Sequence, residues 1–469
     1  MKKLKTILLV SLLAAMMTIG VVSLVDKDAT KSVTENRKLA ERPKFTFSSL
    51  WDGSYGKAME TYYSDTFPGR EMMLKANKIL NKFYYFSGSK EDNTLIVDFD
   101  GPGASGGQAL NPVQPTDPAD TEGEQLPDDP GQAETPDSQP EDVPPAPQEP
   151  EPNYDDMDYT SAGSIIIMGD NAMDIPTATD SIIDSYGEAI NNIQQALGED
   201  VRVISLITPN SGQFYSPTDL HTGVHDQKAM IERCYGAMND RVFTVDAYSV
   251  LDAHKQEDLF FRTDHHWTAL GAYYAYTAFC KTAGFEPVPL ENFKTGTYEG
   301  FVGSMYGYTS QYPQSQALKD NPDTLTYYLP PVETQAAFFP NAEMNNAQAN
   351  WVDVINTNLP ESEKNRYMCF LSGDHPVVRV TSSSNGPTCV VLKDSYGNAF
   401  IPFLTNHYSE ILVIDPREFN QDGKPSLGLV SFVQEHQVQD VIALNYPFMI
   451  NLKSYVKLLN KLVGIGLEG

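Results

Sequence analysis

The sequence has few cysteines, and none of them is paired at metal-binding or redox spacing. The four cysteines are far apart and form no CxxC motif; they are Cys234, Cys280, Cys369 and Cys389. This pattern excludes a zinc finger or ribbon and a dense disulfide framework, and it allows two disulfides at most.

Basic residues are also scarce. Lysine and arginine total 33 against 62 acidic residues, which gives a formal net charge of -29. A chain with this charge repels a phosphate backbone instead of neutralising it, so we expect no nucleic-acid partner. The 469 residues, 41% of them hydrophobic, are enough for a large buried core.

The N-terminus carries a long stretch without any charge. Lysines at positions 2, 3 and 5 precede residues 7–25, which are apolar enough and numerous enough to cross a bilayer as a helix. No A-x-A-like cleavage site follows. We expect an uncleaved signal anchor over residues 1–26 and a single-pass protein of the cell membrane, with all later residues outside the cytoplasm. Cleavage of the segment would instead give a secreted protein.

Two further segments precede the main domain. Residues 27–100 are expected to form a membrane-proximal helical segment, because apolar residues recur there at helical spacing. Residues 101–158 contain 13 prolines, 15 acidic residues and no lysine or arginine. That composition buries too little apolar surface to offset the entropy of folding, so we expect a disordered insertion.

In residues 159–469, strand-like and helix-like patterns alternate. The expected strands are 164–168, 201–207, 241–245, 389–392, 411–414 and 440–444. Their β-branched runs are typical of buried parallel strands. The expected helices are 181–197, 227–238, 268–282 and 446–462. We therefore predict an α/β fold with helices on both faces of a sheet and a site at the carboxyl ends of the strands. The less regular stretch 291–379 is expected to cap that site.

The stretch 260–272, FFRTDHHWTALGA, places acidic and imidazole groups beside a helix start. In an extended chain, residues two apart share a face, so Asp264 and His266 point the same way and His265 points away. A carboxylate and an imidazole so placed are suited to be the orienting residue and the base of a catalytic triad. The other interpretation is a capping Asp with a His bonded to backbone. Thr268 is expected to cap the next helix.

The stretch 390–403, VVLKDSYGNAFIPF, carries a serine where a strand turns into a helix. A serine at such a turn is exposed at the edge of the sheet, close to backbone N–H groups that stabilise developing negative charge. Ser395 is therefore a candidate nucleophile. Its other interpretation is an ordinary helix cap.

Together these stretches resemble a known family. The TDHHWT motif at 263–268, the KDSYGN motif at 393–398 and the YYSDTFPGRE segment at 62–71 look like the DHHW family of bacterial envelope proteins. That family is similar to the SGNH-hydrolase-like acetyltransferases of alginate O-acetylation. The resemblance implies Ser395 as nucleophile, His266 as base and Asp264 as the residue that orients it. It also implies a three-layer α/β/α fold with a permuted motif order, because the Asp and His here precede the Ser.

The sequence departs from the SGNH pattern at two points. The usual GDS reads Lys393, Asp394, Ser395 here, and D-x-H replaces D-x-x-H. The oxyanion-hole residues therefore stay open. Candidate donors are the backbone N–H of Ser395 and the side chains of Asn398, Asn210 and Asn445, each of which is equally suited to a turn or a cap. Residues 367–376 resemble another family stretch without an assigned role.

A metal site and a cofactor are not expected. His221 and His225 stand four residues apart, but Gly223 lies between them and no HExxH pattern surrounds them.

Three functions are compatible with these residues. The first is serine-dependent transfer of an acyl group, acetyl by the resemblance, to or from hydroxyls of an exported cell-envelope polysaccharide. The resemblance also implies a membrane-bound O-acyltransferase as a partner. The second is a non-catalytic glycan-binding or assembly protein of the same fold. The third is metal-dependent deacetylation, which would be sensitive to a chelator.

Overall fold

The computed structural model describes residues 42–44, 55, 59, 62, 63, 66, 152–345 and 349–466. The chain divides into two compact units, Met1–Gly103 and Ala104–Gly469. The predicted signal anchor, most of residues 27–100 and the predicted insertion up to residue 151 lie outside the described residues. In the described part, no helix combines the length and the apolar character that crossing a bilayer requires.

The second unit is built on a seven-stranded sheet in the order β5-β4-β12-β10-β11-β9-β8. The strands from β5 to β11 in that order are parallel, and β9 and β8 are antiparallel at one edge. The predicted α/β fold with a central sheet is confirmed, and five of the six predicted strands lie in this sheet. The strands are β4 Arg202–Ile207, β5 Val242–Val245, β8 Thr334–Phe339, β9 Val377–Ser382, β10 Thr388–Lys393, β11 Glu410–Ile414 and β12 Asp440–Asn445.

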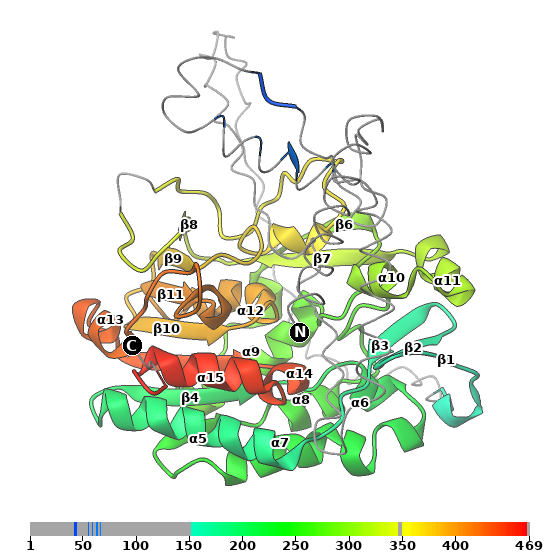
Figure 1. The fold of residues 1–469 in the computed structure, drawn as a ribbon, viewed down its shortest axis with the longest axis horizontal. Helices are drawn as coiled ribbons and strands as arrows, with labels where there is room; N and C mark the ends of the chain where they lie inside the picture. The colour runs from blue at the N-terminus through cyan, green and yellow to red at the C-terminus, as the bar shows by residue number, and fades with distance from the viewer. Residues whose placement is uncertain are drawn as a thin grey trace, which may run out of the picture. The chain divides into compact units, whose positions relative to one another are not determined.

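Helices cover both faces of this sheet (Figure 1). On one face α5 packs against α7, α13 and α15, and on the other α9 packs against α8 and α12. All six residues of β12 are buried, which explains why the central strands read as nearly continuous apolar runs. The helices are α5 Asp180–Leu197, α6 Gly212–Tyr215, α7 Gln227–Gly236, α8 Ala247–Ala253, α9 Ala269–Ala283, α12 Gly397–Leu404, α13 Leu429–Glu435, α14 Pro447–Ile450 and α15 Lys453–Leu462. Short 3₁₀ helices are η2 Thr218–Leu220, η3 Gly223–His225, η4 Leu290–Asn292, η5 Pro313–Ser315, η7 Arg366–Cys369 and η8 Pro416–Glu418.

The predicted strand at 164–168 forms, but not in the main sheet. It is β2 (Ile165–Met168), the middle of a separate antiparallel sheet with β1 (Thr160–Ala162) and β3 (Asn171–Asp174). Gly163 and Gly169 flank it with φ of 78° and 59°, a conformation that favours glycine. These two turns reverse the chain at both ends of β2, so the parallel pairing that we expected is wrong.

The helix predicted at 446–462 is two helices. Asn451 interrupts it because its side chain leaves the helix, accepting from the N–H of Thr179 at 2.9 Å and donating to the carbonyl of Thr177. A side-chain amide that bonds distant backbone competes with helix continuation. The chain therefore ends α14 at Ile450 and restarts at Lys453 as α15.

The irregular stretch 291–379 does more than cap the site. It supplies the edge strand β8 and the first residues of its antiparallel neighbour β9. It also supplies a pair of antiparallel strands, β6 (Lys294–Phe301) and β7 (Asp323–Leu329), with the short helices α10 (Ser304–Thr309) and α11 (Gln316–Asp320) between them. The stretch therefore contributes strands to the main sheet in addition to the contact that Ser304 makes with Asp264.

The folded part also begins before residue 159. Residues Tyr154–Asp156 form the 3₁₀ helix η1, and the Asp155 carboxylate accepts from the N–H of Thr218 at 2.6 Å. A contact with a residue so far along the chain leaves no trace in local composition, which is why the boundary was placed too late.

Candidate active site

Three side chains meet at the carboxyl end of β10. The Nε2 of His266 lies 2.7 Å from the Oγ of Ser395, and its Nδ1 lies 2.6 Å from Oδ1 of Asp264. Asp264 and His266 lie in a bend before α9, and Ser395 lies in the turn between β10 and α12. The structure therefore brings together the three residues that the sequence singled out, at the spacing of a nucleophile, a base and an orienting carboxylate.

The bend at Asp264 fixes the direction of its carboxylate. Oδ1 accepts from the backbone N–H of His266 at 3.1 Å as well as from its ring, and Oδ2 accepts from the N–H of Ser304 at 2.7 Å. Gly303 leaves the space for this contact, because a Cβ there would lie 2.2 Å from the Cβ of Asp264. The 291–379 stretch thus holds the carboxylate from the side opposite the imidazole.

The carboxylate stays ionised in this buried position. Burial alone would raise the pKa of Asp264, which is 4% exposed. The positive charges that His266 and His265 can carry, together with the hydrogen bonds from His266 and the Ser304 N–H, outweigh burial and lower this pKa well below its usual value. An ionised Asp264 keeps the proton of His266 on Nδ1 and leaves Nε2 free to accept the proton of Ser395.

The position of His265 differs from the prediction. Its ring centroid lies 3.8 Å from that of His266, and its Nδ1 lies 2.6 Å from Oγ of Ser304, because residues 262–266 form a bend and not an extended strand. Burial, then repulsion by His266, lowers the pKa of His265 to about 3, so its ring is neutral at pH 7.

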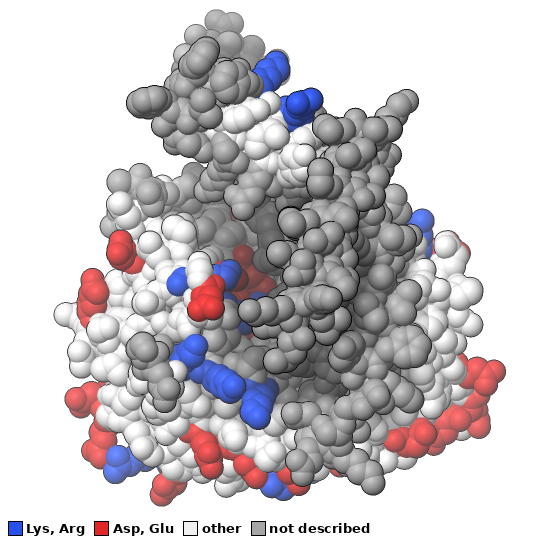
Figure 2. All heavy atoms as spheres, viewed as in Figure 1, with Lys and Arg blue, Asp and Glu red and all other residues white. Residues whose placement is uncertain are grey.

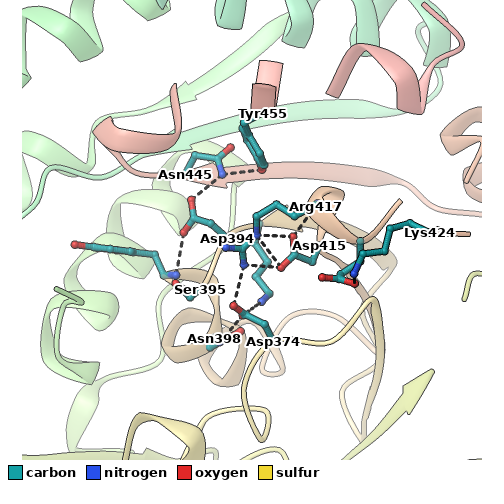
Figure 3. Close-up of polar contacts among 12 residues, drawn as sticks. Asp374, Asp394, Ser395, Asn398, Asp415, Arg417, Lys424, Asn445 and Tyr455 are labelled. Carbon is teal, nitrogen blue, oxygen red and sulfur yellow. Dashed lines mark hydrogen bonds and ion pairs between the residues drawn. The ribbon is translucent and has the colours of Figure 1, made fainter. Parts of the chain in front are cut away.

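The turn that carries Ser395 is fixed from behind (Figure 3). Asp394 accepts from the N–H of Tyr396 at 2.9 Å and from the side chain of Asn445 at 2.8 Å. Burial raises the pKa of Asp394 to about 6, partly offset by these two bonds. Ser395 does not cap α12, since no side chain caps that helix and its hydroxyl is directed to His266. The cap interpretation is therefore excluded.

The three asparagine candidates differ in what their amides already bind. Asn445 uses its amide nitrogen for Asp394 and for the hydroxyl of Tyr455 at 2.9 Å, so the expectation that it serves an oxyanion is wrong. Asn398 donates to Asp374 at 2.9 Å. Its carbonyl, an acceptor, is the buried atom that lacks a partner within the described chain. Asn210 keeps a buried amide nitrogen that nothing in the described chain accepts from.

The backbone of the Ser395 turn also offers a donor for an oxyanion. In the Ser395 turn, the N–H groups of Tyr396, Gly397 and Asn398 have acceptors in Asp394 and Ser395. Across the described residues, no acceptor is found for the N–H of Ser395 itself. Two candidates from the sequence analysis therefore keep a donor without an acceptor in the described chain, the backbone N–H of Ser395 and the side-chain amide of Asn210.

The stretch 367–376 supplies two residues that the sequence analysis missed. Tyr367 stacks on His266 with ring centroids 3.9 Å apart and planes at 8°, and its hydroxyl donates to the carbonyl of Ser395 at 3.1 Å. Asp374 binds the fully buried Lys393 at 2.5 Å and Arg417 at 2.8 Å, behind the serine turn (Figure 3). The only signal in the sequence was the family resemblance of this stretch, since neither residue has a diagnostic spacing from Ser395.

The structure also allows a test of metal binding. In the described part, Asp264, His265 and His266 are the group whose ligand atoms lie within 4.8 Å of one another. Both nitrogens of His266 are already engaged by Asp264 and Ser395, so this geometry fits a triad better than a metal centre. His221 and His225 do not converge on one point: they lie near Oγ of Ser216 and the carbonyl of Pro176. The four cysteines are buried and free.

The protein therefore has a mixed α/β fold in which a serine, a histidine and an aspartate meet at the carboxyl end of a parallel strand. The sequence matches the family model described as DHHW protein over residues 35–97 and 129–414, and the chain therefore belongs to the DHHW family. A crystal structure of a DHHW family protein from Eubacterium siraeum is similar, with 27% identity and a TM-score of 0.56 over 65% of this chain and 97% of that one.

Two further solved structures are more distant. PatB1 of Bacillus cereus with a sulfonyl adduct is 16% identical at a TM-score of 0.49, covering 63% of this chain and 97% of that one. The O-acetyltransferase domain of AlgJ from Pseudomonas putida is 13% identical at a TM-score of 0.36, covering 64% and 96%. A comparison with curated proteins finds no match.

Proposed function

We propose that this protein is an SGNH-type serine acyltransferase of the cell envelope. It would move an acyl group, acetyl by the family resemblance, to or from hydroxyls of an exported polysaccharide through an acyl-serine intermediate. The observation that carries the proposal is the continuous chain of hydrogen bonds from Asp264 through His266 to Ser395, at 2.6 and 2.7 Å. Both distances are within the range in which a base can take the proton of a nucleophile.

The first half of the reaction loads the serine. Oγ of Ser395 attacks the acyl carbon of a donor ester while Nε2 of His266 takes its proton, and Asp264 stabilises the imidazolium that forms. The N–H of Ser395 is free to bind the oxyanion of the tetrahedral intermediate. The donor's alcohol then leaves with the proton from His266, and the acyl group remains on Oγ.

The second half unloads the serine. A hydroxyl of the acceptor attacks the acyl carbon and gives its proton to Nε2 of His266. The bond between the acyl carbon and Oγ breaks, and Oγ recovers a proton from the imidazolium. Water in place of the acceptor gives hydrolysis by the same steps, so transferase and esterase differ only in which acceptor the site holds.

The setting is part of the proposal. The basic and apolar N-terminus supports a membrane anchor with the site outside the cytoplasm. An enzyme there has no direct access to cytosolic acetyl donors, so a membrane-bound O-acyltransferase that passes acetyl groups across the bilayer would be its donor partner.

Ser395→Ala tests the chemistry. The full-length chain in detergent is incubated with p-nitrophenyl acetate, and release of p-nitrophenol is followed. We expect the variant to lose activity by about 10³-fold or more while keeping its thermal midpoint, since the triad acts as a unit. Ser454→Ala is the matched control, because Ser454 is exposed on α15.

Other outcomes would select the other functions. Equal background release by the wild type and Ser395→Ala, with cellular function retained in the variant, would favour a non-catalytic glycan-binding or assembly protein. Activity that survives in Ser395→Ala but is lost with a chelator would point to metal-dependent deacetylation by the Asp264, His265 and His266 group.

A further inference from the structure

A cavity of about 410 Å³ lies between the segments that follow β4 and β5. Its lining comes from residues 152–155, from residues within 213–221 after β4, and from residues within 248–256 after β5. This volume is typical of sites for small molecules, which span roughly 300–1,000 Å³. The strands β4, β12 and β10 are parallel neighbours, so the segments that follow β4 and the Ser395 turn leave the sheet at the same edge.

Hydrogen bonds join the walls of this cavity to one another. Nε2 of Gln213 donates to the hydroxyl of Tyr248 at 3.3 Å, and the hydroxyl of Tyr215 donates to the carbonyl of Lys255 at 3.0 Å. Both bonds connect the segment after β4 with the segment after β5. The cavity is therefore pre-formed, which lowers the entropic cost of binding a ligand there.

Aromatic rings form part of the lining. Tyr154, Tyr215 and Tyr248 are half-buried, so each keeps some surface toward solvent. The ring of Tyr154 meets that of Tyr215 at 6.2 Å, and the buried Phe214 supports Tyr248 at 5.6 Å between centroids. An aromatic ring offers an apolar face to the C–H groups of a sugar, and a phenol adds a polar hydroxyl at its edge.

Charged groups with exposed surface complete the lining. The side chains of Asp252 and Lys255 are 46% and 32% exposed, and Nζ of the lysine lies 3.2 Å from Oδ1 of the aspartate. Within the described chain, Oδ2 of Asp252 has no hydrogen-bond partner. Asp155 and His221 also line the cavity. With His221 neutral, two carboxylates face one ammonium, which disfavours an anion, whereas sugar hydroxyls can donate to the carboxylates and accept from the lysine.

The cavity touches the segment that carries the base of the triad. Phe214 and Tyr215 each pack on Phe260, with ring centroids 6.1 Å apart in both pairs. Phe260 forms an antiparallel bridge with Trp267, the residue after His266. These contacts place the cavity wall against the base of the bend that holds Asp264 and His266.

We propose that this cavity binds a neutral sugar of the exported polysaccharide, at a position along the polymer other than the sugar that reacts at Ser395. The inference rests on the proposed function and deepens it, because it names a second place at which the protein holds its polymeric substrate. Binding at one place makes binding at the other intramolecular, which strengthens the hold on a polymer. A small ester reacts at Ser395 without using the cavity, so the two sites can be measured separately.

Glycan binding tests the cavity directly. The full-length chain in detergent is applied to an array of oligosaccharides built from neutral hexoses, N-acetylhexosamines or uronic acids, and the strongest ligand is then titrated in solution. We expect the wild type and Ser395→Ala to bind neutral oligosaccharides in preference to acidic ones. In Asp252→Ala the Kd should rise by about tenfold, the scale of one hydrogen bond to a charged group, while p-nitrophenol release stays within about twofold of the wild type. Asp200→Ala, at an exposed position, should bind like the wild type.

A second variant and the thermal midpoint separate this role from a structural one. Asp252→Ala breaks only an exposed ion pair, so its midpoint should stay close to that of the wild type. Tyr248→Leu removes a ring from the lining and should also raise the Kd. Weaker binding of Asp252→Ala together with a lower midpoint would show a structural role and overturn the inference.

Three further results would overturn it. They are no glycan bound by the wild type or a preference for uronic acids, loss of binding in Ser395→Ala, and a Kd unchanged in both Asp252→Ala and Tyr248→Leu. In each case Ser395-dependent release of p-nitrophenol would leave the proposed function intact. Glycan binding at the cavity by a chain that releases no p-nitrophenol would instead support the cavity and contradict the serine chemistry.

Discussion

At the scale of single residues, Tyr367 is the most informative neighbour of the triad. Its ring lies flat against His266, and its hydroxyl holds the carbonyl of Ser395. One side chain therefore sets both the plane of the base and the position of the nucleophile. Such a residue acts by positioning, since it does not itself exchange a proton with the acyl group.

Two substitutions separate these effects. Tyr367→Phe keeps the ring and loses one hydrogen bond, so kcat for p-nitrophenyl acetate should fall by about fivefold. Tyr367→Leu also loses the stacked ring, so its kcat should be lower by about another tenfold. Tyr159→Phe, at a residue that is 39% exposed, is the control. Equal losses in Phe and Leu would show that the ring contact does not position His266.

Asp264 gives a second prediction at this scale. Asp264→Asn keeps the shape, but an amide can donate to Nδ1 of His266 and so favours the tautomer that carries its proton on Nε2. That tautomer cannot take a proton from Ser395, and kcat should fall by about 10⁴-fold. The exposed Asp258→Asn in the same loop should leave kcat unchanged. A loss of tenfold or less in Asp264→Asn would contradict the orienting role.

Sequence reasoning found the site where the motif is local and missed it where contacts are distant. Asp264 and His266 are two residues apart, so their meeting follows from the chain itself. Tyr367 and Asp374 reach the serine turn only through tertiary packing. Asn445 was misread because a polar residue after a strand gives no sign of whether it faces the site or the core.

At the scale of elements, a strained turn before β9 places the side chain of Asp374 at the ends of two other strands, β10 and β11. Leu371, Ser372 and Gly373 have φ of 52°, 53° and 93°, an uncommon left-handed run that delivers Asp374 to the ends of β10 and β11. Burial would raise the pKa of Asp374, but the charges of Lys393 and Arg417 hold it well below its usual value. The buried ion pairs therefore lock the turn behind Ser395.

Breaking the buried ion pair of Lys393 with Asp374 should destabilise the protein. Lys393 has no exposed surface, so Lys393→Met leaves Asp374 with Arg417 alone and should lower the unfolding free energy by about 3 kcal/mol. Urea unfolding measures it. Adding Asp374→Asn should restore part of the loss, because it removes the buried negative charge that Lys393 had balanced. The surface pair of Lys424 with Glu418 offers the control, and Lys424→Met should cost at most about 1 kcal/mol.

The strands that the sequence predicted best are those with both faces buried. The strands β4, β10, β11 and β12 are buried on both faces, and their apolar runs show it. Residues 165–168 look the same but pair within their own hairpins, because two glycine turns decide the partners. The strand β9, which lies between β11 and the edge strand β8, carries Arg379 bound to Glu410 on β11, and this polar residue hides the strand pattern.

At the scale of the whole molecule, the acidity is unevenly distributed. Residues 101–158 hold 15 acidic residues and no basic one. On the face seen in Figure 2, acidic side chains lie along the rim and also near the centre, and basic ones form a row over α15, whose lysines are Lys453, Lys457 and Lys461. The net charge therefore says little about the buried carboxyls, four of which respond to pH in two opposite ways.

The opposite pKa shifts of these carboxyls predict how stability changes with pH. Asp264 and Asp374 have lowered pKa values, so their stabilisation is present above about pH 4 and is lost as the pH falls through their folded-state pKa values. Asp174 and Asp394 have pKa values raised from 3.8 to about 7 and about 6, so between pH 4 and 7 the folded state holds protons that the unfolded state has lost. Stability should therefore fall as the pH rises through that window.

Urea unfolding of the wild type and of Asp174→Leu at pH 4, 5, 6, 7 and 8 isolates the contribution of one carboxyl. Charge repulsion across the rest of the chain is common to both proteins and cancels in the difference between their unfolding free energies. That difference should grow in favour of the variant from pH 4 to 7, by at most about 4 kcal/mol, and stay constant above pH 8. A difference independent of pH would mean that Asp174 ionises in the folded protein as it does in water, and that some group in solution already satisfies it.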